Sequence, residues 1–246
     1  MSDHIQDIRL DLAAAYRMAA RQGLNEGICN HFTMMVPGSE DRFLLIPYGL
    51  HWSEVTASSL IEVDFDGNLI EGEGIAETTA FCIHAPIHRA NPKARCLLHT
   101  HMPFATALSM LEDFRFPMAS QNELMFYGRI AYDDEYKGLA FDTDEGDRLA
   151  RVMGDCDVLM MANHGVMIAG PDIATAYDDL YYLEQACRTL VYALQTGQPL
   201  KRVPQDVVAS TAGQMNRGRS EPRDGALHHF ASIRRILDRH EPDYAT

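Results

Sequence analysis

Two histidines one residue apart close an apolar run in the stretch Cys96-Leu97-Leu98-His99-Thr100-His101-Met102-Pro103. Side chains alternate along a β-strand, so His99 and His101 on a strand project to the same side. Such a pair could hold a transition metal through two ring nitrogens. Histidines of a half-buried strand can instead form hydrogen bonds alone, and the pair by itself leaves both interpretations open.

A second apolar run, Asp157 to Ala162, ends in Asn163-His164-Gly165. His164 at a strand end, beside a glycine that permits a tight turn, would add a third imidazole. Three neutral nitrogens leave a metal its full positive charge and open coordination positions, which favour anionic oxygen ligands. We therefore predict a metal site on His99, His101 and His164. Zinc, manganese, iron and cobalt all accept three nitrogens, so the ligands alone do not select the ion.

The combination of His-Thr-His after an apolar strand with a later Asn-His-Gly resembles the class II aldolase/adducin family. The resemblance runs from about Ile8 to Gln198. It implies an α/β protein with a three-layer α/β/α fold and a mostly antiparallel central sheet. It also implies one divalent metal ion, zinc first, held by the three histidines. Sugar-phosphate aldolases and epimerases of this kind act on small-molecule substrates as homo-oligomers, often tetramers, with the site at a subunit interface.

The segments that bind phosphate in the family are altered in this chain. The family's Gly-Asn-x-Ser corresponds to Asn30-His31-Phe32-Thr33, and its Pro-Ser-Gly corresponds to Pro47-Tyr48-Gly49. Two hydroxyls of its Ser-Ser-Glu survive as Thr78 and Thr79. The resemblance thus assigns substrate contacts to His31, Thr33, Tyr48, Thr78 and Thr79. The large Tyr48 ring and the loss of the family's Asn make a standard sugar phosphate a poor fit.

The proton-transfer groups of the family are also displaced. Its catalytic Glu falls on Ala80, and Glu77, a little upstream, could replace it only if the loop is remodelled. In the aldolases a tyrosine of a neighbouring subunit donates a proton, and Tyr132 is its nearest match by position. A positioned proton shuttle usually contributes ~10²–10⁴-fold to the rate. Decarboxylation suffers least from its loss, because it needs only a late protonation.

These observations favour a divalent-metal-dependent lyase, of the aldolase or decarboxylase type, that cleaves a carbon–carbon bond in a small carbonyl or carboxylate compound. One alternative is an iron-dependent oxygenase on the same three histidines, with room for dioxygen beside Ala80. Another is a non-catalytic, adducin-like interaction module. The intact histidine set counts against the module, because a purely structural domain needs no open metal site.

A helix predicted from about Thr79 to Ala90 carries His84 and His88 one turn apart. The spacing could provide a second metal pair. A buried or supporting role is favoured, because the resemblance assigns the metal to other residues.

The elements that position these residues follow from periodicity and from glycine and proline. Helices are predicted over 5–22, 79–90, 103–111, 143–153, 173–196 and 226–239, strands over 32–36, 43–49, 158–161 and 166–168, and a hairpin over 58–70. Residues 113–136 are predicted to form a long irregular connection.

Length and composition fit one domain over residues 1–246, with a polar C-terminal extension from about residue 200. A net charge of −14 without a basic patch argues against nucleic-acid binding. No apolar run approaches the ~20 residues of a membrane span, and the polar N-terminus does not resemble a signal peptide. The five cysteines are scattered and lack a Cys-x-x-Cys pair, which suits a reducing compartment. We therefore expect a cytoplasmic protein with no membrane partner.

Overall fold

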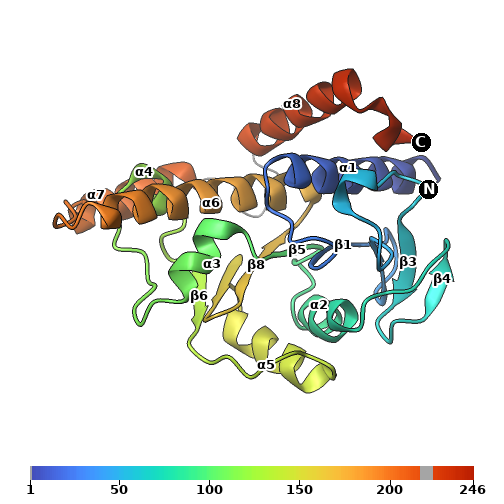
Figure 1. Ribbon diagram of the computed structural model, residues 1–246, viewed down its shortest axis with the longest axis horizontal. Coiled ribbons are helices and arrows are strands. Elements are labelled where there is room, and N and C mark those ends of the chain that lie inside the picture. The colour runs from blue at the N-terminus through green and yellow to red at the C-terminus, as the bar shows by residue number, and fades with distance from the viewer. Residues whose placement is uncertain (1, 217–223) are drawn as a thin grey trace.

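A mixed sheet runs through the middle of the molecule, with helices on both of its faces (Figure 1). The structure is a computed structural model that describes residues 2–216 and 224–246. Within these residues the chain forms one eight-stranded sheet in the order β4-β3-β2-β1-β5-β8-β7-β6. The strands are β1 (His31–Met35), β2 (Arg42–Leu45), β3 (Ile61–Asp64), β4 (Leu69–Glu71), β5 (Cys96–Thr100), β6 (Ile130–Asp133), β7 (Val158–Met161) and β8 (Gly165–Gly170). Neighbouring strands are antiparallel except β6 and β7, so the predicted mostly antiparallel α/β/α fold is confirmed.

Two helical layers enclose the sheet. The helices are α1 (Ser2–Arg21), α2 (Thr78–Ala90), α3 (Pro103–Ser109), α4 (Gln121–Leu124), α5 (Thr143–Met153), α6 (Ile173–Gln195), α7 (Gln205–Met215) and α8 (Asp224–His240). Short 3₁₀ turns lie at Trp52–Glu54 and Pro242–Ala245. Helices α1, α6 and α8 lie on one side of the sheet, whereas α2 and α5 lie on the other (Figure 1).

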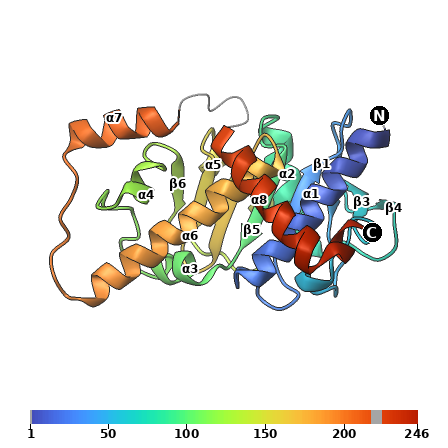
Figure 2. The ribbon, with the colours of Figure 1, turned by 90° about the horizontal axis from the view of Figure 1, so that it is seen from above.

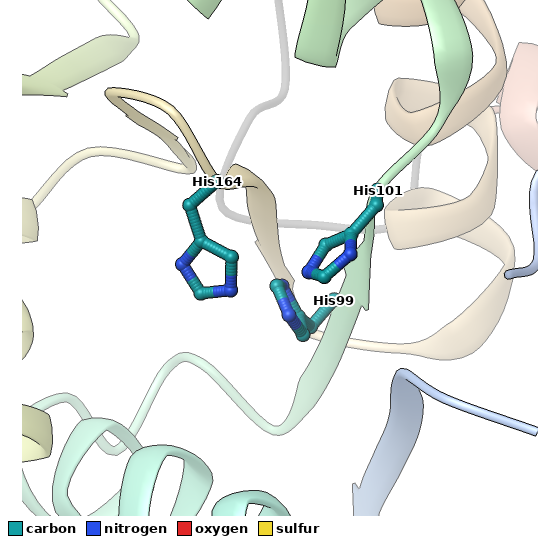
Figure 3. Close-up of side chains that lie close together, drawn as sticks. All are labelled: His99, His101 and His164. Carbon is teal, nitrogen blue, oxygen red and sulfur yellow. The ribbon is translucent and has the colours of Figure 1, made fainter. Parts of the chain in front are cut away.

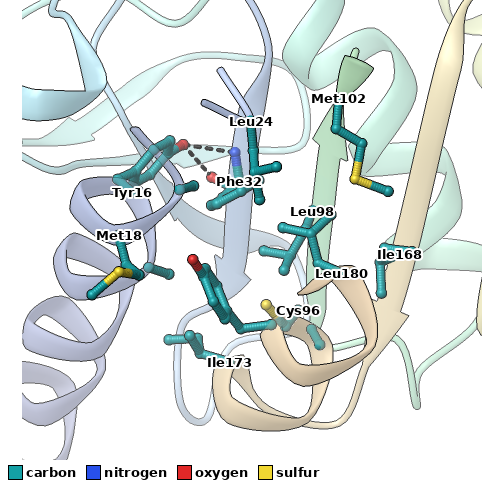
Figure 4. Close-up of a cluster of buried hydrophobic side chains, with 14 of the residues drawn as sticks. Tyr16, Met18, Leu24, Phe32, Cys96, Leu98, Met102, Ile168, Ile173 and Leu180 are labelled. Atoms are coloured by element: carbon teal, nitrogen blue, oxygen red, sulfur yellow. Dashed lines mark hydrogen bonds between the residues drawn. The ribbon is translucent and has the colours of Figure 1, made fainter. Parts of the chain in front are cut away.

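The two central strands send different residues to the two layers. On β1, Phe32 and Met34 enter the larger apolar core beneath α1 and α6, whereas His31 and Thr33 point toward α2. In that core the buried Tyr16 hydroxyl accepts a hydrogen bond from the Phe32 amide and donates one to the Phe32 carbonyl, both at 2.7 Å (Figure 4). Because side chains alternate on a strand, this pattern separates an apolar face from a polar face.

Helices α2 and α5 touch at an unusually close point. Pro86 inside α2 has no amide hydrogen, so the carbonyl of Cys82, one turn earlier, loses its helical donor. This carbonyl faces Gly146 of α5, where an added Cβ would lie 2.0 Å from the Cys82 oxygen. Glycine at 146 therefore lets the α5 backbone approach this carbonyl closely.

The interval predicted as an irregular connection, 113–136, is more ordered than expected. It contains α4 and the edge strand β6. Strand β6 pairs in parallel with β7, in the register Ile130↔Val158 to Asp133↔Met161. A partner strand far along the chain supplies these hydrogen bonds, so a local pattern could not reveal them.

The polar C-terminal extension is also part of the packed structure. Helix α8 lies against α1 and α6 and buries Phe230, Ile233 and Leu237 (Figure 2). Helix α7, which the sequence analysis did not predict, precedes it and packs against α4. Among the described residues, no helix is long and apolar enough to cross a membrane.

Candidate metal centre

Three imidazole rings meet where β5 ends and β7 turns into β8 (Figure 3). They belong to His99, His101 and His164, and one ring nitrogen of each lies within 4.8 Å of the corresponding nitrogens of the other two. The ring centroids are 4.9 to 5.1 Å apart. The structure thus brings together the three side chains that the sequence analysis predicts as metal ligands.

Hydrogen bonds determine which nitrogen of two rings faces the centre. Nδ1 of His99 lies 2.9 Å from the Val166 carbonyl, which only accepts, so Nδ1 carries the hydrogen and Nε2 is unprotonated. Nδ1 of His101 donates in the same way to the Glu26 carboxylate at 2.6 Å. The Nε2 atom of His101 is then buried, without a hydrogen-bond partner among the described residues. A buried lone pair backed by a carboxylate is the arrangement expected of a metal-binding histidine.

The Asn-His-Gly turn permits this convergence. Asn163 adopts φ of 55°, and the turn places His164 opposite the end of β5. A Cβ at Gly165 would lie 2.5 Å from the Thr100 carbonyl oxygen and 2.9 Å from Cδ2 of His101. Glycine is therefore required there, because any side chain would displace the strand that carries two of the rings.

A loop before β1 supports His101 from the other side. Asn30 adopts φ of 70°, and its side-chain oxygen accepts a hydrogen bond from the His101 amide at 3.2 Å. This contact and the Glu26 carboxylate hold both the backbone and the ring of His101.

Glu184 of α6 fixes the segment that follows His101. Its carboxylate accepts hydrogen bonds from the amides of Phe104 and Ala105, at 2.9 and 3.0 Å, in the first turn of α3. Burial raises the pKa of Glu184 to about 7, and these two amides oppose the increase.

The three rings open into a cavity of about 390 Å³. Its acidic lining residues are Glu26, Glu77, Asp133, Glu135 and Glu145. No lysine or arginine is among the described residues that line it. Arg148, outside the lining, binds Asp133 and Glu145 at 2.5 and 2.6 Å. The described residues of the lining therefore offer many hydrogen-bond acceptors and no cationic side chain to balance an anionic substrate.

The electrostatic setting keeps the histidines neutral, which is the form that binds a cation. Burial, and then the neighbouring His101, lower the pKa of His164 to about 4. Burial and three neighbouring rings hold the pKa of His99 well below its usual range.

Three of the predicted substrate and proton-transfer residues reach the cavity. His31, Glu77 and Thr79 line it, and the Thr79 hydroxyl donates to the Glu77 carboxylate at 3.1 Å. Glu77 lies directly before α2, so its side chain faces the cavity without remodelling of the loop.

Three other predicted contacts, Thr33, Tyr48 and Thr78, do not line this cavity. Thr33 is fully buried, with its hydroxyl shared between the rings of His84 and His88. Tyr48 and Thr78 are exposed and outside the cavity. Family position alone did not give the depth or direction of these side chains.

Tyr132 lies away from the cavity of its own chain. Its ring packs against the larger core and its hydroxyl accepts a hydrogen bond from the Phe116 amide at 3.2 Å. Burial raises the pKa of Tyr132 to about 12. Tyr136, just beyond β6, lines the cavity instead, with its ring centroid 6.1 Å from that of His164. The sequence analysis missed Tyr136 because it did not predict the strand that carries the chain there.

His84 and His88 lie behind the cavity, in the supporting position that the sequence favoured. Both are buried and bond to the Thr33 hydroxyl, and neither belongs to the cluster of candidate metal ligands. His84 also bonds to His31, which does line the cavity.

Comparisons with known proteins agree with this fold. The family model described as "Class II Aldolase and Adducin N-terminal domain" matches residues 10–191. A Caulobacter vibrioides protein named "Putative aldolase class 2 protein" is 34% identical over 242 residues, covering 96% of this chain and 91% of that protein. Human beta-adducin is 30% identical over 249 residues, covering 94% of this chain but 33% of the adducin. The crystal structure of an aldolase II superfamily protein from Pseudomonas syringae has a TM-score of 0.90 at 34% identity, covering 98% of this chain and 96% of that one.

Proposed function

The chain belongs to the class II aldolase and adducin family, and on that basis we propose that it is a divalent-metal-dependent lyase. It would cleave a carbon–carbon bond, as an aldolase or a decarboxylase, in a small carbonyl or carboxylate compound. The observation that carries this proposal is the convergence of three imidazoles at a cavity, with the buried Nε2 of His101 backed by Glu26.

His99, His101 and His164 would hold the cation. Zinc is the first choice, and iron, manganese and cobalt suit the same donors. A divalent cation bound there supplies a Lewis acid that polarises a substrate carbonyl or carboxylate oxygen. Glu26 keeps the proton of His101 on Nδ1, so that Nε2 stays available as a ligand.

The cavity wall provides candidates for binding and proton transfer. His31 and Thr79 would contact substrate, and Glu77, held by the Thr79 hydroxyl, would move a proton. Tyr132 would act only from a neighbouring subunit of a homo-oligomer, a tetramer by family expectation, because it does not reach its own cavity. Tyr136 is the nearer tyrosine within one chain.

The charge of the cavity favours a substrate without a phosphate group. A phosphate monoester carries nearly two negative charges at neutral pH. The described residues that line the cavity include five acidic side chains and no lysine or arginine. A neutral carbonyl compound, or a carboxylate bound to the metal itself, avoids that repulsion. We propose that such a compound is processed in the cytoplasm.

Metal analysis of the purified full chain, before and after reconstitution with Zn²⁺, tests the proposal. We expect one equivalent of metal in the wild type and a loss of binding in His164→Ala. His240→Ala is the matched control, because His240 is exposed at the end of α8 and should leave the metal content unchanged. A wild-type protein that binds no metal after reconstitution would overturn the lyase.

That outcome would instead favour the adducin-like interaction module, the second candidate, which the similarity to human beta-adducin supports. An iron-loaded protein that consumes dioxygen with hydroxy acids or phenolic acids would replace the lyase by an oxygenase. Carbon–carbon cleavage of a carbonyl compound without dioxygen uptake supports the lyase.

A further inference from the structure

A continuous chain of hydrogen bonds runs from the back of α2 to the cavity. The Ala94 carbonyl lies 2.6 Å from Nδ1 of His88, and Nε2 of that ring lies 2.8 Å from the Thr33 hydroxyl. The same hydroxyl lies 2.7 Å from Nδ1 of His84, whose Nε2 lies 2.9 Å from Nδ1 of His31. His31 lines the cavity, so three buried rings and one hydroxyl connect it to a fixed backbone group.

The carbonyl at one end fixes the direction of every bond in this chain. A carbonyl only accepts, so a neutral His88 carries its hydrogen on Nδ1 and accepts from the Thr33 hydroxyl on Nε2. The Thr33 oxygen, having used its single hydrogen, accepts from Nδ1–H of His84. Nε2 of His84 then accepts from Nδ1–H of His31. Nε2 of His31 is left unprotonated.

The surroundings favour three neutral rings. Ala94, Thr33 and the rings themselves provide the contacts along the chain, and none of these is a carboxylate that could balance an imidazolium. Burial lowers the pKa of His88 to about 4, and burial together with the neighbouring rings holds the pKa of His84 well below its usual range. A charged ring in this layer would lack a counterion in contact.

The cavity end of this hydrogen-bond chain, Nε2 of His31, has no hydrogen to donate. The Thr79 hydroxyl lies 3.4 Å from Nε2 of His31 and 3.1 Å from the Glu77 carboxylate. Its one hydrogen goes to the nearer and charged acceptor. Nε2 of His31 is therefore free to accept a hydrogen bond from a molecule in the cavity.

We propose that His31 is a specificity-determining residue whose Nε2, kept unprotonated through His84, Thr33 and His88, accepts a hydrogen bond from a substrate hydroxyl. The assignment rests on the proposed lyase function, because the substrate must bind beside the three-histidine centre. His84, Thr33 and His88 are positioning residues that act through His31.

The position of His31 indicates which hydroxyl it recognises. His31 is the cross-strand partner of His99, with ring centroids 5.4 Å apart. A small compound held at the three histidines would therefore lie beside His31, within reach of a group next to its bound oxygen. With an acidic wall that also accepts hydrogen bonds, the site selects an unphosphorylated carbonyl compound with a hydroxyl on the adjacent carbon.

The first test measures the tautomer directly in the metal-free full chain. Long-range ¹H–¹⁵N NMR spectra of ¹⁵N-histidine-labelled protein distinguish a protonated from an unprotonated ring nitrogen, and His31→Gln assigns the signal. We expect His31 to carry its hydrogen on Nδ1 alone. Thr33→Val should introduce the Nε2–H form of His31, whereas Thr33→Ser should preserve the wild-type spectrum. A wild-type His31 protonated on Nε2, or one unaffected by Thr33→Val in a folded protein, would overturn the inference.

The second test uses two probes that differ in one donor, hydroxyacetone and methoxyacetone. Binding to the Co²⁺-loaded protein is followed by the visible spectrum of the metal. We expect the wild type to prefer hydroxyacetone by about tenfold, the effect of one hydrogen bond. His31→Phe, which keeps a ring but removes the acceptor, should abolish the preference.

Equal affinity of the wild type for both probes would contradict the assignment. A loss of metal affinity in His31→Phe would also contradict it, because His31 would then be a metal ligand. A wild-type protein that binds no metal would overturn the proposed lyase, while the NMR measurement without metal would still decide the tautomer of His31.

Discussion

Strands β1 and β5 show two ways of filling a protein interior. On one face Phe32 and Leu98 pack among apolar side chains beneath α1 and α6 (Figure 4). On the other face, one residue along, His31 and His99 meet the polar side of α2. Both faces are buried to a similar degree.

The difference lies in what each face requires of its residues. The apolar face needs matching volume, and hydrophobic side chains of similar size can replace one another. Each group on the polar face needs a partner of the right donor or acceptor type, because an unpaired buried polar group costs about 1–3 kcal/mol. The polar face is therefore the more sharply specified of the two and the one that reaches the cavity.

Low pH should produce the largest difference between the two faces, because it lowers the stability that the polar face contributes and leaves that of the apolar face unchanged. Burial depresses the pKa of His88 to about 4, with Arg95 acting in the same direction, and holds the pKa of His84 well below its usual range. An unfolded histidine titrates near 6.5, so below that pH the unfolded chain binds more protons than the folded one. The contribution of each neutral histidine to the free energy of unfolding is fully present above about pH 6.5. Below that pH it falls by ~1.4 kcal/mol per pH unit, down to about pH 4 for His88. Urea unfolding at several pH values measures this slope.

The control is His88→Gln, whose amide can donate to Ala94 and accept from Thr33 without titrating. Its slope between pH 6 and 4.5 should be smaller by ~1.4 kcal/mol per pH unit. An unchanged slope would mean that His88 is not kept neutral by the fold.

Phe32→Ala tests the apolar face. Removing this fully buried ring should lower the free energy of unfolding by about 3–5 kcal/mol, because a cavity remains against Tyr16 and Trp52. Zinc stoichiometry of the folded fraction should stay the same. A loss of zinc in a folded Phe32→Ala protein would show that the two faces are not independent.

His84→Leu makes the corresponding change on the polar face. The Nδ1–H group of His31 and the Thr33 hydroxyl each lose a partner, while burial of the leucine compensates in part. We expect a loss of about 1–3 kcal/mol in denaturant unfolding. His84→Gln, which can keep one of the two hydrogen bonds, should lose less, and a reversed order of the two variants would contradict the network.

Glu26→Gln should give the smallest change in stability and a specific change at the centre. The Glu26 side chain is largely exposed, but it fixes the hydrogen of His101 on Nδ1. Losing such a supporting carboxylate typically weakens metal affinity by about 10–100-fold. Competition with a chelator measures the affinity, and Glu241→Gln, at a half-buried ion pair with Arg21 outside the cavity lining, is a control. Equal zinc affinity in both variants would remove Glu26 from the site.

The sequence predicted most of the fold and the centre because the signals are local. Period-two alternation placed His99 and His101 on one side of a strand, and the Gly165 turn identified His164. The strand β6 escaped prediction because its pairing with β7 is distant in sequence, and Tyr136 was missed with it. The family resemblance assigned Thr33 to the substrate but could not give its depth. That depth depends on the position of α2, which places His84 and His88 over the Thr33 hydroxyl.

The contact between Pro86 and Gly146 couples the position of the hydrogen-bonded histidines to that of the acidic residues lining the cavity. Helix α2 carries His84 and His88, and α5 carries Glu145 next to the glycine. With the Cys82 carbonyl almost touching the α5 backbone, neither helix can slide or rotate without the other. If the cavity widens, α2 and α5 should therefore move together as one rigid unit. The backbone change should fall in the segment between β6 and α5, which lines the cavity and carries the exposed Leu139.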